Sequence, residues 1–167
     1  MADTSIHLYA IALGSNRAVA ARRGPAQLLQ EALTRIAVHG DVLAVAPIIV
    51  TAPLGPSSRR FANSAALVKT SLPPQAMLAF LQSVETSLGR RRYRRWGARS
   101  MDIDIILWSG GLWRSRSLII PHPAFANRDF VLSPLTAIAT DWRPPRLGCA
   151  IRHLNARFIK TKRTARG

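Results

Sequence analysis

Two amphipathic segments, each opened by proline and closed by glycine, constrain the fold of this chain more than any other feature. The first runs from Pro25 to Gly40, and its apolar stripe is formed by Leu29, Leu33, Ile36 and Ala37. The second runs from Pro73-Pro74 to Gly89, and its stripe is formed by Met77, Phe80, Leu81, Val84 and Leu88. Proline suits a first helical turn, and glycine suits the residue after a last one. The spacing therefore predicts two helices, each with one buried face.

Short apolar runs rich in branched residues flank these helices and predict strands. They cover residues 6–13, 42–50, 61–70 and 103–108, with Pro47 marking an edge or a bulge in the second run. The resulting order is strand, helix, strand, strand, helix, strand. This order predicts an α+β fold of the split βαβ type, an antiparallel sheet with both helices on one face.

The rest of the chain is expected to add smaller elements to a single domain. Its 167 residues suit one compact unit, which we place at residues 1–150. Residues 130–139 predict short helical turns interrupted at Pro134. Residues 151–167 are expected to form a solvated, mobile basic tail.

The charge of the chain is strongly positive, with 24 Lys and Arg against 8 Asp and Glu and a net charge of +16. This balance favours polyanionic partners without choosing among them, and weak polyanion binding by the basic tail is one expectation. No apolar run approaches the roughly 20 residues of a membrane span, so no membrane partner is expected. Cys149 is the only cysteine, which fits a reducing compartment and a cytoplasmic location.

A pair of aspartates, Asp102 and Asp104, is the most informative local pattern. Side chains two apart on a strand point to the same face, while Ile103, Ile105 and Leu107 are expected to turn into the core. Two adjacent carboxylates repel each other unless water or cations separate them, and carboxylate oxygens suit Mg²⁺. The alternative is a half-exposed strand with two solvated aspartates.

An arginine-rich segment, residues 89–99, immediately precedes this strand. Arginine presents a planar fork that matches phosphate oxygens, and Trp96 offers a flat face to a heterocycle. Cations next to a metal-binding carboxylate pair suit phosphoryl chemistry. A solvated basic loop and a nucleic-acid-binding loop fit the same residues when they are considered alone.

Residues 95–104, Arg-Trp-Gly-Ala-Arg-Ser-Met-Asp-Ile-Asp, resemble the signature of the 6-hydroxymethyl-7,8-dihydropterin pyrophosphokinases of folate biosynthesis. Further segments match this family in the same order along the chain: residues 12–16, 51–56, 61–63, 82–92, 121–123 and 127–135. The resemblance implies a ferredoxin-like α+β fold. It also implies transfer of a pyrophosphoryl group from ATP to the hydroxymethyl group of the pterin, with release of AMP.

The resemblance also implies roles for individual residues. Two Mg²⁺ ions would be held by Asp102 and Asp104, and Arg90 and Arg99 would be the catalytic cations. The residues implied for the pterin are Thr51, Ala52, Pro53, Leu54, Phe61, Asn63, Trp96 and Phe130. The residues implied for ATP are Gln82, Glu85, Arg92, Ile105, His122 and Arg128.

The chain departs from the family pattern at a few positions. Ala52 and Ala98 replace prolines, and Pro123 follows His122 where an aromatic residue is common. These departures leave open a silent or specialised pterin-binding relative. The net charge of +16, with its basic loop and tail, leaves open a second alternative, a basic nucleic-acid-binding module.

Overall fold

The structure is a computed structural model and describes residues 5–16, 24–51, 60–89 and 101–165. Its main sheet has the strand order β2 (Asp41–Val45), β4 (Phe61–Thr70), β1 (His7–Ser15) and β5 (Asp102–Trp108), and β3 (Ile49–Thr51) also pairs with β4. Every pair in this sheet is antiparallel. The element order and the antiparallel sheet confirm the predicted split βαβ arrangement.

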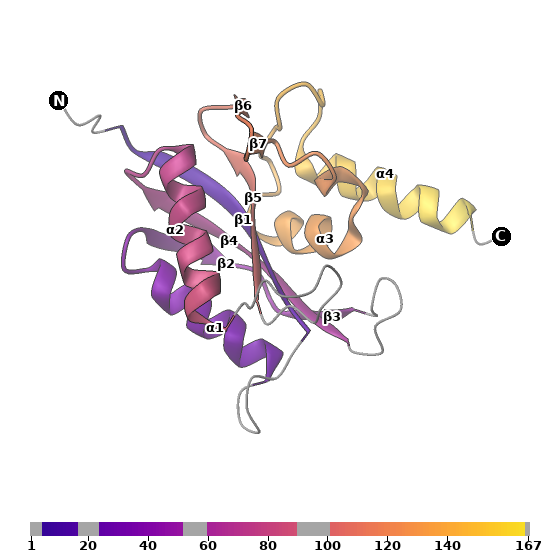
Figure 1. Ribbon diagram of the computed structural model, residues 1–167. Helices are drawn as coiled ribbons and strands as arrows, with labels where there is room; N and C mark the ends of the chain where they lie inside the picture. Colours follow the sequence, from indigo (N-terminus) through magenta and orange to yellow (C-terminus); the bar gives the residue numbers. More distant parts are fainter. Residues whose placement is uncertain (1–4, 17–23, 52–59, 90–100, 166–167) are drawn as a thin grey trace.

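Helices α1 (Pro25–Ile36) and α2 (Pro74–Ser87) lie together on one face of the sheet, as Figure 1 shows. Their buried stripes form a first hydrophobic core with one face of β1, β4 and β5. The sequence predicted both helices from the helical period of these stripes. In α1, however, the buried residues are Leu28, Leu29, Ala32 and Ile36, while Ala37 of the predicted stripe is exposed just after the helix. Tyr9 holds the segment before α2, because its hydroxyl donates a hydrogen bond to the Leu72 carbonyl oxygen at 2.7 Å. Burial raises the pKa of this hydroxyl, so Tyr9 stays a donor.

The opposite face of the sheet is covered by α3 (Asp129–Ile138), with α4 (Ile151–Thr164) packed behind it (Figure 1). The short helix η1 (Phe125–Asn127) leads into α3, and β6 (Trp113–Arg114) pairs with β7 (Ile119–Ile120) in a separate two-stranded sheet. Residues from α3, η1 and α4 form a second core with this face of the sheet. None of the described helices combines the length and apolar character that crossing a membrane requires.

The prediction that Leu107 lies on the same face of β5 as Ile103 and Ile105 is wrong, because a β-bulge interrupts the pairing of β1 and β5. Ala10 pairs with Leu107 and Ile11 with Ile105, so Ile106 is an extra residue between them. Ile103 and Ile105 enter the first core as predicted, whereas Leu107 lies in the second core with Ile106. The bulge reverses the alternation after Ile105, because an extra residue shifts the side-chain period by one.

Two later segments also differ from their predictions. The predicted interruption at Pro134 is wrong, because α3 continues through this residue. The proline removes one N–H hydrogen bond from the helix. Burial of Val131, Leu132 and Leu135 in the second core offsets this loss. The expected mobile tail is instead a helix to Thr164, held by Ile151, whose side chain is buried in the second core. The division of the chain at residue 150 stays a prediction.

Candidate active site

Three neighbouring strands present a row of aligned residues on the face that carries α3. Gly14 of β1 pairs with Asn63 of β4 on one side and with Asp102 of β5 on the other. Asn63 is only 5% exposed. A Cβ atom at position 14 would lie 3.1 Å from the Asn63 Oδ1. The glycine therefore leaves a depression between an amide and a carboxylate.

The two aspartates lie on this same face, as the alternation predicted. Asp102 and Asp104 are both half-buried, while Ile103 and Ile105 on the opposite face are buried. Asp104 pairs with Ala12, so each carboxylate of β5 lies opposite a residue with little or no side chain. Small neighbours leave room beside both carboxylates for a ligand.

Helix α3 supplies the other wall of the depression. Arg128, Phe130 and Val131 line the same cavity of about 190 Å³ as Asn63, Asp102 and Asp104. The Cζ of Arg128 lies 5.8 Å from the centre of the Phe130 ring, a distance within the range of a cation–π contact. Burial of Leu132 and Leu135 in the second core fixes the helix against the sheet. The cavity therefore combines two acids, an amide, an aromatic ring and a guanidinium group.

Further polar and aromatic groups lie next to Asn63. The Asn63 Nδ2 donates to the Thr51 Oγ1 at 2.8 Å, and Thr51 pairs with Phe61 across β3 and β4. Phe61 precedes Asn63 by two residues on β4, so both side chains lie on the same face of the sheet. Thr51 thereby fixes the orientation of the amide and leaves its oxygen for other donors.

The residues predicted for the nucleotide do not join this cavity as one group. The buried Glu85 on α2 accepts the Ile103 N–H through its Oε1 at 2.8 Å, and Ile105 lies in the first core on the far face of β5. Gln82 is exposed on α2. The Nδ1 of His122 accepts the Ala124 N–H at 3.2 Å. Among the predicted ATP residues that the structure describes, only Arg128 lines this cavity.

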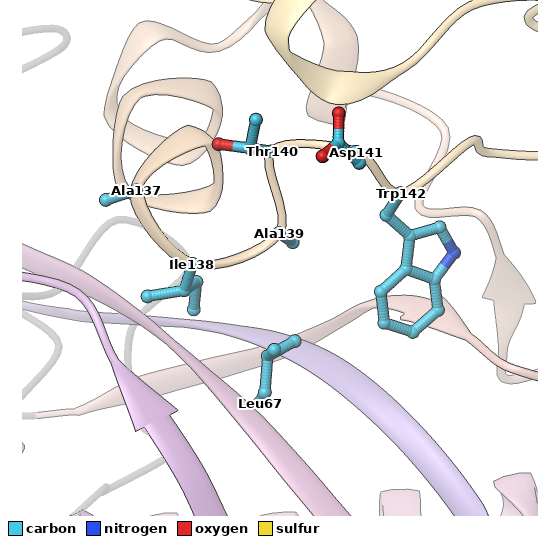
Figure 2. A pocket seen from close by; sticks show the side chains of 7 residues that line it. All are labelled: Leu67, Ala137, Ile138, Ala139, Thr140, Asp141 and Trp142. Atoms are coloured by element: carbon cyan, nitrogen blue, oxygen red, sulfur yellow. The ribbon is translucent and has the colours of Figure 1, made fainter.

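A second hollow lies at the other end of α3, and its lining makes it a poor candidate for phosphate binding. Figure 2 shows Leu67 facing the turn that follows α3, with Ile138, Asp141 and Trp142 around the same space. The lining residues include no cation among the described part of the chain. Asp141 forms an ion pair with Arg152. A mainly apolar lining without a cation offers no partner for phosphate oxygens, so we assign no function to this hollow.

Comparison with known protein families identifies the family of this chain. Residues 10–140 match the family of 7,8-dihydro-6-hydroxymethylpterin-pyrophosphokinase (HPPK). The chain belongs to the HPPK family. This match spans most of the chain and includes every described residue that lines the cavity.

Individual relatives agree with this assignment. The chain is 39% identical to the 2-amino-4-hydroxy-6-hydroxymethyldihydropteridine pyrophosphokinase of Pseudomonas aeruginosa over 81% of its own length and 82% of the relative. It is 37% identical to the enzyme of that name from Haemophilus influenzae, over 78% of the chain and 81% of the relative. The same enzyme of Bacillus subtilis is 40% identical, over 77% of the chain and 75% of the relative.

Solved structures confirm the ferredoxin-like fold. Plasmodium falciparum HPPK-DHPS with SDX-DHP superposes with a TM-score of 0.76 at 13% identity, over 98% of this chain and 46% of that one. The same protein with pteroate gives a TM-score of 0.76 at 13% identity, over 97% of this chain and 44% of that one. This chain thus spans less than half of those longer chains. At this identity the likeness concerns the fold alone.

The structure brings together some of the predicted site residues, and others lie outside the described residues. Asn63, Asp102, Asp104, Arg128 and Phe130 share one cavity. The residues outside the described ranges are Ala52, Pro53, Leu54, Arg90, Arg92, Trp96 and Arg99. Their predicted roles stay predictions.

Sequence reasoning assigned no role to four residues that line the cavity: Ala12, Leu13, Gly14 and Val131. Ala12 and Gly14 carried a usable signal, because small residues two apart on a strand share one face. Which strands lie beside them depends on the register of the sheet, which the sequence of β1 alone does not contain.

Proposed function

We propose that this HPPK family member transfers the pyrophosphoryl group of ATP to the hydroxymethyl group of 6-hydroxymethyl-7,8-dihydropterin and releases AMP. We place the reaction at the cavity between α3 and the sheet. One observation carries this placement: Asp102 and Asp104 share a cavity with the Asn63 amide and the Phe130 ring. Acids for a metal and neutral groups for a flat heterocycle thus lie at one site.

The two aspartates fit Mg²⁺ by the chemistry of their donors. Carboxylate oxygens are hard ligands, and magnesium commonly takes one or two carboxylates together with phosphate oxygens and water. The described residues contain no group of three or more His, Cys, Asp or Glu that would hold a metal alone. Asp102 and Asp104 would therefore share Mg²⁺ with the phosphates of ATP, and the resemblance to the family implies two such ions. When bound, the metal supplies positive charge that neutralises phosphate oxygens.

The pterin fits the half of the cavity that Asn63 and Phe130 form. A flat heterocycle requires a stacking face and a few fixed polar groups, and an amide matches the donors and acceptors of a pterin edge. Phe61, two residues from Asn63 on β4, would provide a second aromatic face. Thr51 would act by holding the Asn63 amide, because the two side chains are hydrogen-bonded at 2.8 Å.

The triphosphate would meet cations from α3 and from the arginine-rich segment. Arg128 lines the described cavity, where a guanidinium group can form paired hydrogen bonds with phosphate oxygens. We assign Arg90 and Arg99 to the neutralisation of charge in the transition state, and Arg92 to ATP binding. Gln82 and His122 would form the nucleotide side next to β5, while the buried Glu85 and Ile105 would support it from the core.

The proposed reaction requires positioning and charge neutralisation more than a strong base. The side chains around the acceptor hydroxyl would orient it toward the β-phosphorus, and exclusion of water would protect the ATP from hydrolysis. We expect the enzyme in the cytoplasm, where the single cysteine of the chain fits a reducing compartment. Polyanion binding by the basic C-terminal segment is a separate proposal.

Product identification tests the reaction against its closest alternatives. We would incubate the protein with ATP, Mg²⁺ and the pterin and follow the products by ³¹P NMR. We expect AMP together with a pyrophosphate ester of the pterin. ADP with a monophosphate ester would contradict pyrophosphoryl transfer. Pterin binding without any phosphorus product would instead identify a silent relative.

A further inference from the structure

The end of the chain has a charge distribution that the proposed reaction does not explain. Residues 142–167 contain eight Lys and Arg and no Asp or Glu. Most of these cations lie on α4, at the edge of the molecule away from α1 and α2 (Figure 1). Of those within the described residues, none lines the cavity that holds Asp102 and Asp104. This segment therefore carries a concentrated positive charge outside the candidate active site.

Two cations of α4 are paired with acids, and three others form a stripe on its surface. Arg152 pairs with Asp141, and Lys162 pairs with Asp129 at 2.9 Å. Arg157, Lys160 and Arg163 are exposed and form no ion pair with the described residues. Each is three residues from the next, so adjacent cations are about 4.5 Å apart along the helix axis. Like charges at this spacing repel, and a bound polyanion would relieve the repulsion.

The apolar side of α4 is partly covered by the body of the protein. Ile151 belongs to the second core, and Leu154 and Phe158 pack against it but stay partly exposed. An amphipathic helix binds a bilayer by inserting its whole apolar face, and only part of that face is free in this helix. The cationic stripe therefore favours a soluble polyanion over a lipid surface.

A groove between η1 and α4 meets this stripe at Arg157, from which the stripe turns around the helix toward Arg163. It has a volume of about 530 Å³, with Ala126, Leu154 and Phe158 as its apolar lining and with Arg157 and Lys162 as its cations. The Lys162 Nζ lies 6.0 Å from the centre of the Phe158 ring. Proteins that bind single-stranded nucleic acid combine cations for the backbone with an aromatic face for an unstacked base. The stripe provides the cations for the nucleic-acid backbone, and Phe158 in the groove provides the aromatic face for a base.

We propose that α4 binds single-stranded nucleic acid. The phosphates contact Arg157, Lys160 and Arg163, and an unpaired base enters the groove beside Phe158. Duplexes lack a free base for this groove, so they bind more weakly. This inference makes the general polyanion proposal specific, and it does not depend on pyrophosphoryl transfer.

Fluorescence anisotropy with a labelled 20-nucleotide single-stranded RNA tests the stripe. The test variant carries R157Q, K160Q and R163Q, and the charge-matched control carries K69Q, R114Q and R116Q at exposed positions outside α4. We expect the test variant to bind at least about tenfold more weakly at low salt, and the control less than about threefold. The slope of log K against log salt should become less steep by about 2, because single strands contribute roughly 0.7 for each phosphate contact. Equal losses in both variants would overturn the proposal.

Further arms of the experiment identify the ligand. F158L keeps an apolar residue in the groove and should weaken RNA binding about threefold or more, with the melting temperature as the control for folding. Tighter binding to duplex RNA or to vesicles of anionic lipid would overturn the single-stranded assignment, as would displacement of the RNA by MgATP.

The single variant R163Q keeps the test valid should the triple variant fail to fold, because we expect R163Q alone to weaken RNA binding at least about twofold. AMP release by R163Q, measured separately, distinguishes failure of this inference from failure of the proposed reaction.

Discussion

At the scale of single residues, Asn63 connects the sheet to the proposed pterin site. Its amide is buried and is oriented by the hydrogen bond to Thr51, and it lies beside Gly14 in the adjacent strand. A buried amide with a fixed orientation can discriminate between ligands, because a mismatched ligand leaves its polar atoms unpaired. The pair of residues Gly14 and Asn63 therefore gives two sharp tests of the site.

Replacement of Asn63 by alanine should weaken pterin binding selectively. Loss of the amide removes hydrogen bonds worth about 1–3 kcal/mol, which corresponds to a rise of about fivefold to 150-fold in the Kd for the pterin. Titration of pterin fluorescence measures this change, and the KM for ATP should change less. Q30A, which removes an exposed amide from α1, is the control. An unchanged Kd in N63A would remove Asn63 from the pterin site.

The substitution G14A should disturb the same site without unfolding the protein. Its Cβ would lie 3.1 Å from the Asn63 Oδ1, so the amide must move by a few tenths of an ångström. We expect a rise of about threefold to tenfold in the Kd for the pterin, since fixed hydrogen-bond geometry is lost. G24A is the matched control, because nothing lies within 4 Å of a Cβ at that position. Equal effects of both substitutions would argue against crowding at Asn63.

At the scale of elements, α3 both closes the second core and carries part of the cavity wall. Leu132 is fully buried in this core, while Arg128 and Phe130 line the cavity near the start of the helix. The position of these two side chains therefore depends on how α3 packs against the sheet. Packing and function are coupled through a single helix.

The substitution L132A should test this coupling. Truncation of a fully buried leucine costs about 2–5 kcal/mol, which for a domain of this size lowers Tm by about 5–15 °C. Thermal unfolding followed by circular dichroism measures the loss. L154A is the control, because Leu154 is only partly buried. A Tm unchanged by L132A would contradict the packing of α3 described here.

Elements with a regular apolar period were predictable from the sequence, and those that depend on neighbouring strands were not. The stripes of α1 and α2 and the alternation of Asp102 and Asp104 appear directly in the residue order. The side of the sheet taken by Leu107 depends on the bulge opposite Ala10, which is a property of the strand pair. The depression at Gly14 likewise follows from the register with Asn63. Helix α4 was missed because its many cations obscured a short apolar stripe.

At the scale of the whole molecule, the sheet separates a structural face from a functional face. Helices α1 and α2 lie on one face of the sheet, over the first core, and α3 lies on the other (Figure 1). The cavity is on the side of α3. Helix α4 packs behind α3, so the charged end of the chain and the cavity lie on the same side of the sheet. The fold thus concentrates part of the net charge of +16 on α4, on the same side of the sheet as the cavity.

Removal of residues 160–167 should leave the proposed reaction intact. The deletion removes the ion pair between Lys162 and Asp129, and exposed pairs of this kind contribute only about 0–1 kcal/mol. We expect an unchanged kcat for AMP release and a fall in Tm of no more than about 4 °C. A large fall in kcat, with the fold retained, would show that the end of α4 takes part in the reaction.

The most direct test of the central claim is AMP release from ATP and Mg²⁺, measured with and without 6-hydroxymethyl-7,8-dihydropterin. Wild-type protein and D102A would be compared with D41A, which removes an exposed acid from β2 at the edge of the sheet. We predict that AMP forms only when the pterin is present, that D102A lowers kcat at least about a hundredfold, and that D41A retains wild-type turnover. AMP release that is independent of the pterin, or that survives in D102A, would contradict the account.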